Sequence, residues 1–308
     1  MNEVYQKTLS QKISFNGIGL HSGKSSTINL YPAKEDEGIV FKRVDLNNNN
    51  LVKANFANVC STKLCTTLKN DHNVKVSTVE HLLAALYITG VDNALIEINN
   101  EEVPIMDGSS KDFIKVLERT DLVNQKKKRK YLKISDKIQL IDGEKEISIQ
   151  PNSSSLDVHF QLNYKNEIIG KQQNAIDFQK DNLTEVFSSR TFCLFEDIEK
   201  IKKNGLAKGG SLENALVVDN NKVLNEGGLR NEREFVNHKI LDLAGDFLLS
   251  GHRILGKVNC YQGGHELTNL FLRKILSKKS NFRIIELQDI EVSKKFHSKE
   301  IEKIAVNA

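Results

Sequence analysis

The sequence predicts an α+β fold made of two similar units, and three observations support this expectation. Both halves of the chain show the same order of patterns, which is strands, a long helix, a glycine, a strand and a second helix. Nearly the same number of residues lies between His81 and His238 as between Gly90 and Gly251. This similar spacing is a weak signal of an internal repeat. The length of 308 residues also suits about two domains.

The basic run at 126–130 marks the expected boundary between the two units. We expect an N-terminal α+β domain over residues 1–125 and a C-terminal α+β domain over 131–308, with a hydrophobic insert near 190–212. The basic run could instead form a nucleic-acid surface. It is short and lacks interleaved aromatic residues, which favours a solvated linker.

Turn and cap residues delimit the elements of the first unit. The expected elements are a strand at 27–31 that ends before Pro32, a helix at 77–89, a strand at 94–98 and a short helix at 111–119. Ser77 and Glu80 have the spacing of a capping box at the start of the first helix, and Gly90 is a natural stop at its end.

The second unit repeats these patterns after the basic run. Its expected elements are strands at 134–140 and 146–149, a helix at 232–250, a strand at 253–261 and a helix at 267–277. Asp142-Gly143, between the first two strands, is typical of a hairpin turn.

Composition excludes several classes of protein. Hydrophobic residues make up 39% and charged residues 27% of the chain, which is typical of a globular protein. The net charge of +4 is too small to indicate bulk nucleic-acid binding, and no stretch approaches the ~20 apolar residues of a membrane span. The start of the chain lacks the apolar run of a secretory signal, and the four cysteines form no disulfide pattern. We therefore expect a cytoplasmic protein with reduced thiols.

A polar stripe crosses the helix predicted at 232–250. His238, Asp242 and Asp246 are spaced four residues apart and therefore lie on one helix face. Apolar residues occupy most of the remaining circumference, so the helix is expected to be buried. Buried carboxylates and imidazoles need a partner, and a metal ion is one such partner. A His–Asp contact without a metal explains this helix equally well when the helix is taken alone.

Glu80 and His81 could complete a metal site. Taken alone, they are explained by helix capping and by a partly buried histidine. Together with His238 and Asp242, His81 makes three protein ligands and leaves a fourth position for water, as in catalytic zinc sites. Glu80 could then act as a base beside the metal. Two histidines and one carboxylate also suit iron, so the residue types leave Zn²⁺ and Fe²⁺ open.

Two further segments could contribute to catalysis. Gly263 and Gly264 allow a sharp turn that presents His265, which could act as a general acid with its pKa raised by Asp246. A surface histidine after a turn is the alternative. Thr191 could donate a hydrogen bond to a developing oxyanion.

Several stretches match one protein family in the same order along the chain. They lie at 17–23, 78–82, 103–109, 189–192, 223–226, 238–242 and 264–265. On these stretches the chain resembles the UDP-3-O-acyl-N-acetylglucosamine deacetylases, a family of zinc amidases, from about residue 5 to about 280. The resemblance implies two domains, each with a layer of sheet and a layer of helices, and with the helices sandwiched between the two sheets.

The resemblance also implies a catalytic site with one Zn²⁺ ion. Its expected metal ligands are His81, His238 and Asp242, and Glu80 is expected to be the general base that activates the metal-bound water. His265 is expected to be the general acid or the cation that stabilises the tetrahedral intermediate.

Further roles follow from the same resemblance. Asp246 is expected to support His265, and Thr191 to polarise the acetyl carbonyl. Lys239 matches a lysine that contacts the phosphate side of the substrate. The residues expected to line a hydrophobic passage for the 3-O-acyl chain are Leu20, Phe192, Leu194 and Ile198.

The implied reaction removes the N-acetyl group from a UDP-3-O-acyl-N-acetylglucosamine, the committed step of lipid A biosynthesis. We expect a monomer that acts on this small molecule and binds no nucleic acid. A binding protein that keeps the metal site as a relic is the alternative, but it would need neither Glu80, Thr191 nor His265. The family often has a basic residue shortly before the position of His265, where this chain has Gln262 and Gly263, and Lys257 could take over that charge.

Overall fold

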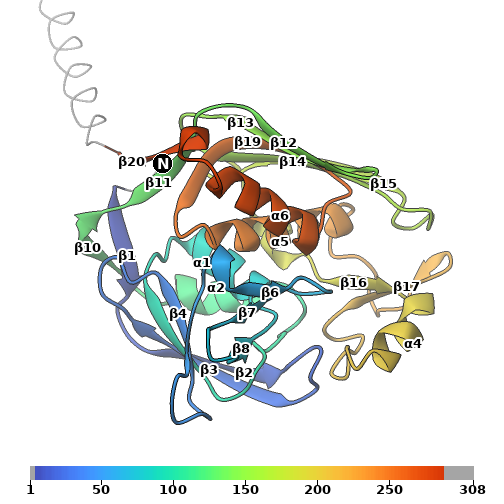
Figure 1. The fold of residues 1–308 in the computed structure, drawn as a ribbon. Helices are drawn as coiled ribbons and strands as arrows, with labels where there is room; N and C mark the ends of the chain where they lie inside the picture. Colours follow the sequence, from blue (N-terminus) through green and yellow to red (C-terminus); the bar gives the residue numbers. More distant parts are fainter. Residues whose placement is uncertain (1–3, 288–308) are drawn as a thin grey trace, which may run out of the picture.

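Two β-sheets enclose a layer of helices in this protein (Figure 1). The structure is a computed structural model and describes residues 4–287. Helices α1 (Glu80–Thr89) and α2 (Lys111–Glu118) face one sheet, and α5 (Glu234–Leu248) and α6 (His265–Leu276) face the other. The predicted α+β class, with its helices between two sheets, is therefore confirmed.

The first sheet has five strands in the order β2-β3-β9-β4-β5. The strands are β2 (Ile13–Ile18), β3 (Ser25–Pro32), β9 (Ala94–Ile98), β4 (Ile39–Arg43) and β5 (Leu51–Lys53). Along β3 the side chains alternate between buried and more exposed positions, and Ile28 and Leu30 are fully buried. Because successive side chains of a strand point to opposite faces, this alternation gives the sheet one apolar face for the helices to cover.

A smaller sheet leads the chain into α1. It contains β6 (Val59–Ser61), β7 (Thr67–Lys69) and β8 (Lys75–Val76), and the short 3₁₀ helix η1 (Phe56–Asn58) precedes it. The backbone N–H of Val79 donates to the carbonyl oxygen of Thr66 over 3.4 Å. This contact ties the start of β7 to the start of α1.

The second sheet has seven strands and is organised around β19. The strands are β11 (Lys130–Ile134), β12 (Ile138–Asp142), β13 (Lys145–Pro151), β14 (Leu156–Asn163), β15 (Lys171–Asp177), β19 (Arg253–Tyr261) and β20 (Phe282–Glu286), the last of which follows the 3₁₀ helix η2 (Lys279–Asn281). Strand β19 pairs antiparallel with β13 and parallel with both β11 and β14.

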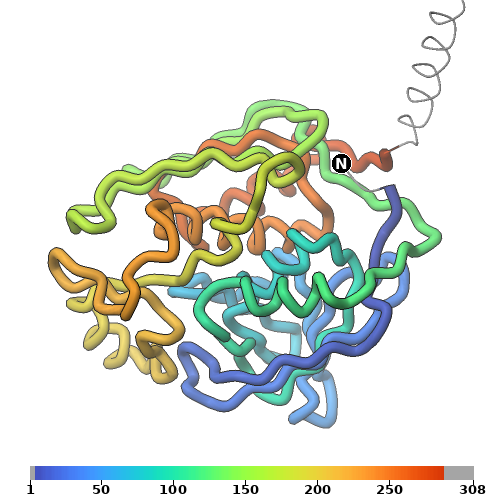
Figure 2. Tube along the Cα trace, turned by 180° about the vertical axis from the view of Figure 1, so that it is seen from behind, coloured from blue at the N-terminus to red at the C-terminus, as the bar shows by residue number. Residues whose placement is uncertain are grey.

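Two remaining groups of elements lie on opposite sides of the molecule (Figure 2). On one side, β1 (Tyr5–Leu9) pairs with β10 (Leu122–Lys128). On the other side, the insert of the second unit projects from the body. The insert contains β16 (Phe192–Leu194), α4 (Phe195–Lys203), β17 (Leu216–Asp219) and β18 (Lys222–Val223), and α3 (Thr184–Ser188) leads into it. Within residues 4–287, no helix is both long and apolar enough to span a lipid bilayer.

The predicted capping box is wrong. Helix α1 begins at Glu80, and its N-terminus has no side-chain cap. The Ser77 hydroxyl instead donates to the carbonyl oxygen of Glu101, because Ser77 is held in an extended bridge with Glu102. The end of the helix is as predicted, since Gly90 adopts a left-handed conformation with φ of 91°.

The expectation of a solvated linker at 126–130 is also wrong. Most of this run belongs to β10, and Lys127 pairs with Asp36 over 2.6 Å. Arg129 is only 4% exposed and its guanidinium contacts Asp92 over 2.7 Å. Strand pairing and a buried ion pair therefore order a segment whose charges alone suggested a loop.

Two element boundaries shift in the second unit. The strand expected at 134–140 is divided, because β11 ends at Ile134 and β12 begins at Ile138. Helix α6 begins at His265 rather than at residue 267. The hairpin between β12 and β13 is as predicted, with Gly143 in a left-handed conformation.

Helices α1 and α5 approach each other closely at Gly245, in the middle of α5. A Cβ atom at this position would overlap the carbonyl oxygen of Glu80 and lie 3.1 Å from the backbone nitrogen of Ala84. Glycine is therefore required here because the backbones of α1 and α5 are in direct contact.

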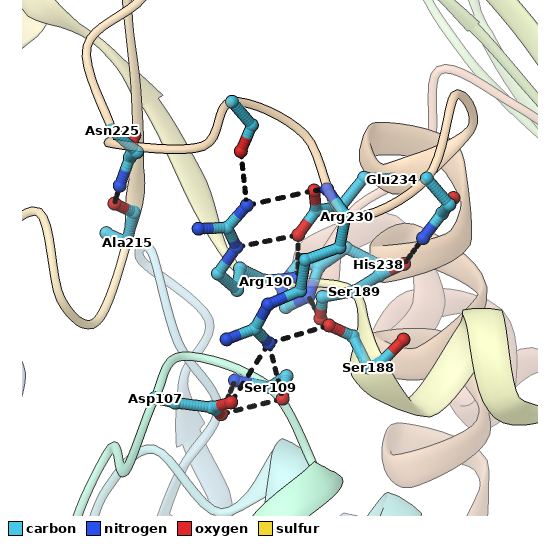
Figure 3. A network of polar contacts seen from close by, with 12 residues as sticks. Asp107, Ser109, Ser188, Ser189, Arg190, Ala215, Asn225, Arg230, Glu234 and His238 are labelled. Atoms are coloured by element: carbon cyan, nitrogen blue, oxygen red, sulfur yellow. Dashed lines mark hydrogen bonds and ion pairs between the residues drawn. The ribbon is translucent and has the colours of Figure 1, made fainter.

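A polar network also connects the first unit to the segments that flank the insert (Figure 3). The Arg230 guanidinium lies 2.9 Å from an Asp107 carboxylate oxygen and donates to the carbonyl oxygen of Ser188 over 2.9 Å. Next to it, Arg190 contacts the fully buried carboxylate of Glu234 over 2.8 Å. Asp107 comes from the loop before α2, so these contacts join segments that are far apart in the sequence.

We predict that Gly245→Ala destabilises the protein by about 1–3 kcal/mol, because the added methyl group overpacks the α1–α5 contact. In an exposed helix the same substitution stabilises by about 1 kcal/mol, so the sign of the change is diagnostic. Denaturant unfolding of both proteins measures it. A variant as stable as the parent would contradict the close approach.

We predict that Asp107→Asn lowers the free energy of unfolding by about 1.5–3 kcal/mol at pH 7, because it removes a charged partner of Arg230. Asp112→Asn is the control, since the exposed Asp112–Lys115 pair should contribute under about 1 kcal/mol. Burial raises the pKa of Asp107, but the Ser109 hydrogen bond and the Arg230 charge outweigh burial and lower it.

This direction sets the pH dependence of the Asp107 effect. A carboxyl with a lowered folded-state pKa contributes fully above its unfolded pKa of about 3.9 and loses that contribution as pH falls through the folded-state value. The difference between parent and Asp107→Asn should therefore shrink in unfolding experiments below about pH 4. An undiminished difference at low pH would rule out a charge-based contribution.

Candidate metal centre

Helices α1 and α5 bring three candidate metal ligands together. His81 lies in the first turn of α1, and His238 and Asp242 lie one turn apart on α5. One nitrogen of each histidine and one Asp242 oxygen lie within 4.8 Å of one another, and all three side chains are buried. Nε2 of His81 is 3.5 Å and Nε2 of His238 is 3.3 Å from Oδ1 of Asp242.

The chemistry of these atoms fits a bound cation. Oδ1 of Asp242 is buried and has no hydrogen-bond partner in the part of the chain that the structure describes. Nδ1 of His238 donates to the carbonyl oxygen of Ser189 over 3.0 Å, which places the proton on Nδ1 and leaves the Nε2 lone pair facing Asp242. An unpaired buried carboxylate oxygen beside an imidazole lone pair is a costly arrangement without a positive charge between them.

The protonation states of His238 and Asp242 also suit metal ligands. Burial, assisted by the neighbouring His81 and Lys239, lowers the pKa of His238 to about 3, so the ring is neutral at pH 7. Burial alone would raise the pKa of Asp242, but the neighbouring His238, Lys239 and His265 side chains outweigh it and hold the pKa well below its ordinary value. Metal ligands must be deprotonated in this way.

Glu80 stands beside the three ligands at the first position of α1. Its Oε2 accepts a hydrogen bond from the backbone N–H of Thr66 over 3.0 Å, and its Oε1 lies 3.8 Å from Nε2 of His265. Burial raises the pKa of Glu80, which the charges of His265 and His81 oppose. A raised carboxyl pKa is typical of a group that exchanges protons near neutral pH.

His265 approaches the same space from α6. Its Nδ1 donates to Oδ2 of Asp246 over 2.9 Å, and its Nε2 points towards Glu80 and Asp242. Burial lowers the pKa of His265, but the carboxylates of Asp246, Asp242 and Glu80 outweigh it and raise the pKa to about 9. His265 is therefore a protonated donor at pH 7.

A cavity of about 350 Å³ opens onto these groups. Lys239 lines it, with Nζ 2.9 Å from Oδ2 of Asp242 and 5.5 Å from the ring centre of Phe192. Thr191 lines it from the start of β16, where its N–H donates to the carbonyl oxygen of Gly108 over 2.8 Å.

A second, mostly apolar cavity of about 330 Å³ adjoins the first. Leu20, Phe192 and Ile198 line it, as expected for a hydrophobic passage, whereas Leu194 lines the first cavity. Leu20 lies in the β2–β3 turn, where the carboxylate of Glu102 accepts hydrogen bonds from neighbouring backbone N–H groups.

The structure adds residues that the sequence analysis missed. Leu64, Ile201 and Leu212 also line the apolar cavity. Ile201 follows Ile198 at helical spacing on α4, and this periodicity could have identified it. Thr66 contacts Glu80, Asp246 and His265, but nothing in its local sequence indicates this.

Lys257 is not the basic residue that compensates for Gln262 and Gly263. It lies on β19 and pairs with Asp157 over 3.5 Å, outside the residues that line the cavity. Lys145, at the start of β13, lines the cavity instead. The hairpin between β12 and β13 brings it there, which the linear sequence does not show.

Comparisons with known proteins agree with this geometry. Residues 6–277 match the family model described as UDP-3-O-acyl N-acetylglycosamine deacetylase. A UDP-3-O-acyl-N-acetylglucosamine deacetylase from Syntrophotalea carbinolica is 43% identical over 284 residues, which is 92% of this chain and 91% of that protein. Proteins of the same name from Saccharophagus degradans and Idiomarina loihiensis are 41% and 39% identical, over 94% and 93% of this chain and 96% and 94% of their own lengths.

The family-model match covers the five-stranded sheet, the seven-stranded sheet except β20, the helix layer and the insert, together with every residue of the candidate metal centre. The chain therefore belongs to the UDP-3-O-acyl N-acetylglycosamine deacetylase family, whose members are metal-dependent enzymes.

Proposed function

We propose that this protein hydrolyses the N-acetyl amide of a UDP-3-O-acyl-N-acetylglucosamine in lipid A biosynthesis, in the cytoplasm and with zinc as its metal. The observation that carries the proposal is one buried cluster in which a metal-ligand set, a carboxylate and a protonated histidine face the same cavity. The apolar cavity beside it suits an acyl chain. The family membership supports the same reaction.

His81, His238 and Asp242 would hold the metal. A zinc ion bound there supplies a water of lowered pKa and stabilises negative charge on a carbonyl oxygen. The two-histidine, one-carboxylate set is common to catalytic zinc sites, and Fe²⁺ is the alternative ion.

Glu80 and His265 divide the proton transfers. Glu80 takes a proton from the attacking water, whose oxygen forms the new bond to the acetyl carbon. His265 then gives its Nε2 proton to the amine nitrogen as the C–N bond breaks, which releases acetate and a free amine. Asp246 orients the His265 ring, and the Thr191 hydroxyl donates to the acetyl carbonyl oxygen.

The two cavities bind different parts of the substrate. Lys239, which lines the first cavity, binds the diphosphate side of the UDP group. The apolar cavity, lined by Leu20, Phe192 and Ile198, takes the 3-O-acyl chain. Leu194, which lines the first cavity, contacts the substrate between these two parts.

We predict that removal of the metal by a chelator abolishes deacetylation and that added Zn²⁺ restores it. Glu80→Gln should retain the metal and lose about 10²–10⁴ in kcat, because it keeps the shape of the side chain and removes the base. His238→Ala should lose the metal as well. Metal analysis and a deacetylation assay on the UDP sugar measure both quantities.

His72→Ala is the matched control, because His72 is exposed on a turn and belongs neither to the ligand cluster nor to the lining of either cavity. Full activity in metal-free protein would rule out the metal mechanism. An active Glu80→Gln variant would rule out Glu80 as the base. Binding of the UDP sugar without turnover in the parent protein would favour a binding protein that keeps the metal site as a relic.

We predict that Ile198→Trp selectively impairs substrates with long acyl chains. The indole would occupy part of the apolar cavity, and each methylene that it displaces costs about 0.8 kcal/mol. Displacing two methylenes should lower kcat/KM about tenfold for a long-chain substrate and leave a short-chain analogue little changed. Glu199→Trp, on the exposed side of the same helix, is the control. Equal losses for both chain lengths would contradict the passage.

A further inference from the structure

Thr66 lies where the groups assigned to proton transfer meet. It is 1% exposed and precedes β7, between the start of α1 and the middle of α5. Its backbone N–H donates to Oε2 of Glu80 over 3.0 Å, and its hydroxyl donates to Oδ1 of Asp246 over 2.6 Å. The same hydroxyl oxygen is 3.4 Å from Nδ1 of His265.

The hydroxyl contact determines how Asp246 can serve His265. An ionised carboxylate only accepts hydrogen bonds, so the single hydroxyl proton of Thr66 is used on Oδ1. Oδ2 is then left for Nδ1 of His265, which donates to it over 2.9 Å. The ring is thereby turned so that Nε2 points at Oε1 of Glu80, 3.8 Å away.

The backbone contact of Thr66 likewise leaves the two oxygens of the Glu80 carboxylate with different partners. Oε2 is held by the Thr66 N–H, and Oε1 is the oxygen that faces His265. The carbonyl oxygen of Thr66 also accepts from the N–H of Val79, which locks the strand against the helix that carries Glu80. Thr66 therefore holds the Glu80 carboxylate directly and the His265 ring through Asp246. Neither contact involves Nε2 of His265, the atom that faces Glu80.

We propose that Thr66 is a positioning residue that fixes the orientation and spacing of the Glu80 and His265 side chains for proton transfer. This inference rests on the proposed function, since it assigns Thr66 a part in that reaction. Thr66 does not line the cavity, so its effect reaches the substrate only through Glu80 and Asp246–His265.

The substitution Thr66→Val tests the hydroxyl contact. Valine keeps the shape of the side chain and removes the donor to Asp246. Loss of a hydrogen bond to a charged group lowers a rate by about tenfold to hundredfold. A misplaced acid affects the chemical step rather than substrate binding. We expect kcat to fall by about that factor, with KM and metal content unchanged.

Two comparisons separate positioning from a general loss of structure. Thr66→Ser keeps the hydroxyl and should restore kcat to within about threefold of the parent, whereas Thr66→Ala should not. Thr67→Val is the matched control, because Thr67 is the next residue and, within residues 4–287, its hydroxyl has a hydrogen-bond contact with the Cys65 sulfur, at 3.7 Å, and none with Glu80, Asp246 or His265. Its kcat should match that of the parent.

A double-mutant cycle with Asp246→Ala gives a readout that a structural role would not change. When Asp246 has been removed, the Thr66 hydroxyl has no carboxylate to hold, so adding Thr66→Val should cost little further activity. An equal loss of kcat in both backgrounds would overturn the proposal. So would a Thr66→Val variant with parental kcat, or a Thr66→Ser variant no better than Thr66→Ala.

Different experimental results would contradict the proposed function and the proposed role of Thr66. A parent protein that does not deacetylate the UDP sugar in its zinc-loaded form would overturn the proposed function. An active parent whose Glu80→Gln variant is inactive, but whose Thr66→Val variant is fully active, would leave the proposed function intact and overturn only the role of Thr66.

Discussion

The contact between α1 and α5 at Gly245 is the constraint on which the rest of the structure depends. His81 and Glu80 come from α1, whereas His238, Asp242 and Asp246 come from α5. These side chains reach a common space only because the two backbones touch at Gly245, where even a methyl group would overlap Glu80. The two sheets hold the helices from outside, and the network around Arg230 joins the loop before α2 to the segments that flank the insert.

Burial of so many charged groups has a cost, and their arrangement offsets it. Glu80, Asp242 and Asp246 are all at most 3% exposed. His265 and Lys239 supply positive charge next to them, and a divalent ion between the three ligands would supply more. Each of these carboxylates also accepts at least one hydrogen bond, whereas Oδ1 of Asp242, the atom that faces both histidines, has no hydrogen-bond partner among the described residues. The site is thus built for charge complementarity at the expense of stability, which is usual where titratable groups perform chemistry.

Periodicity and turn chemistry predicted most of the elements but not all of their boundaries. Residues 253–261 form the expected strand, and the strand expected at 27–31 lies within β3, because alternation is a local signal. The expected stop before Pro32 is wrong, since β3 includes Pro32, which pairs with Ala94 of β9. The capping box at Ser77 and Glu80 was wrong because a bridge to Glu102 holds Ser77 extended. The basic run was misinterpreted for a similar reason, since Asp92 and β1 lie far away in the chain and order it only after folding. Leu194 and Lys257 illustrate the same limit at the site, because cavities form between elements.

The sequence by itself determined the α+β class, the family resemblance and the stripe of His238, Asp242 and Asp246, because these depend on patterns within single segments. Only the tertiary structure shows how close His81 comes to the two α5 ligands, that Lys145 rather than Lys257 lines the cavity, and that Thr66 links Glu80 to Asp246. The physical reason is that helical spacing is a local property of the chain. Distances between helices depend instead on how closely their backbones pack. Here α1 and α5 can pack this closely because residue 245 is a glycine and has no side chain to separate them.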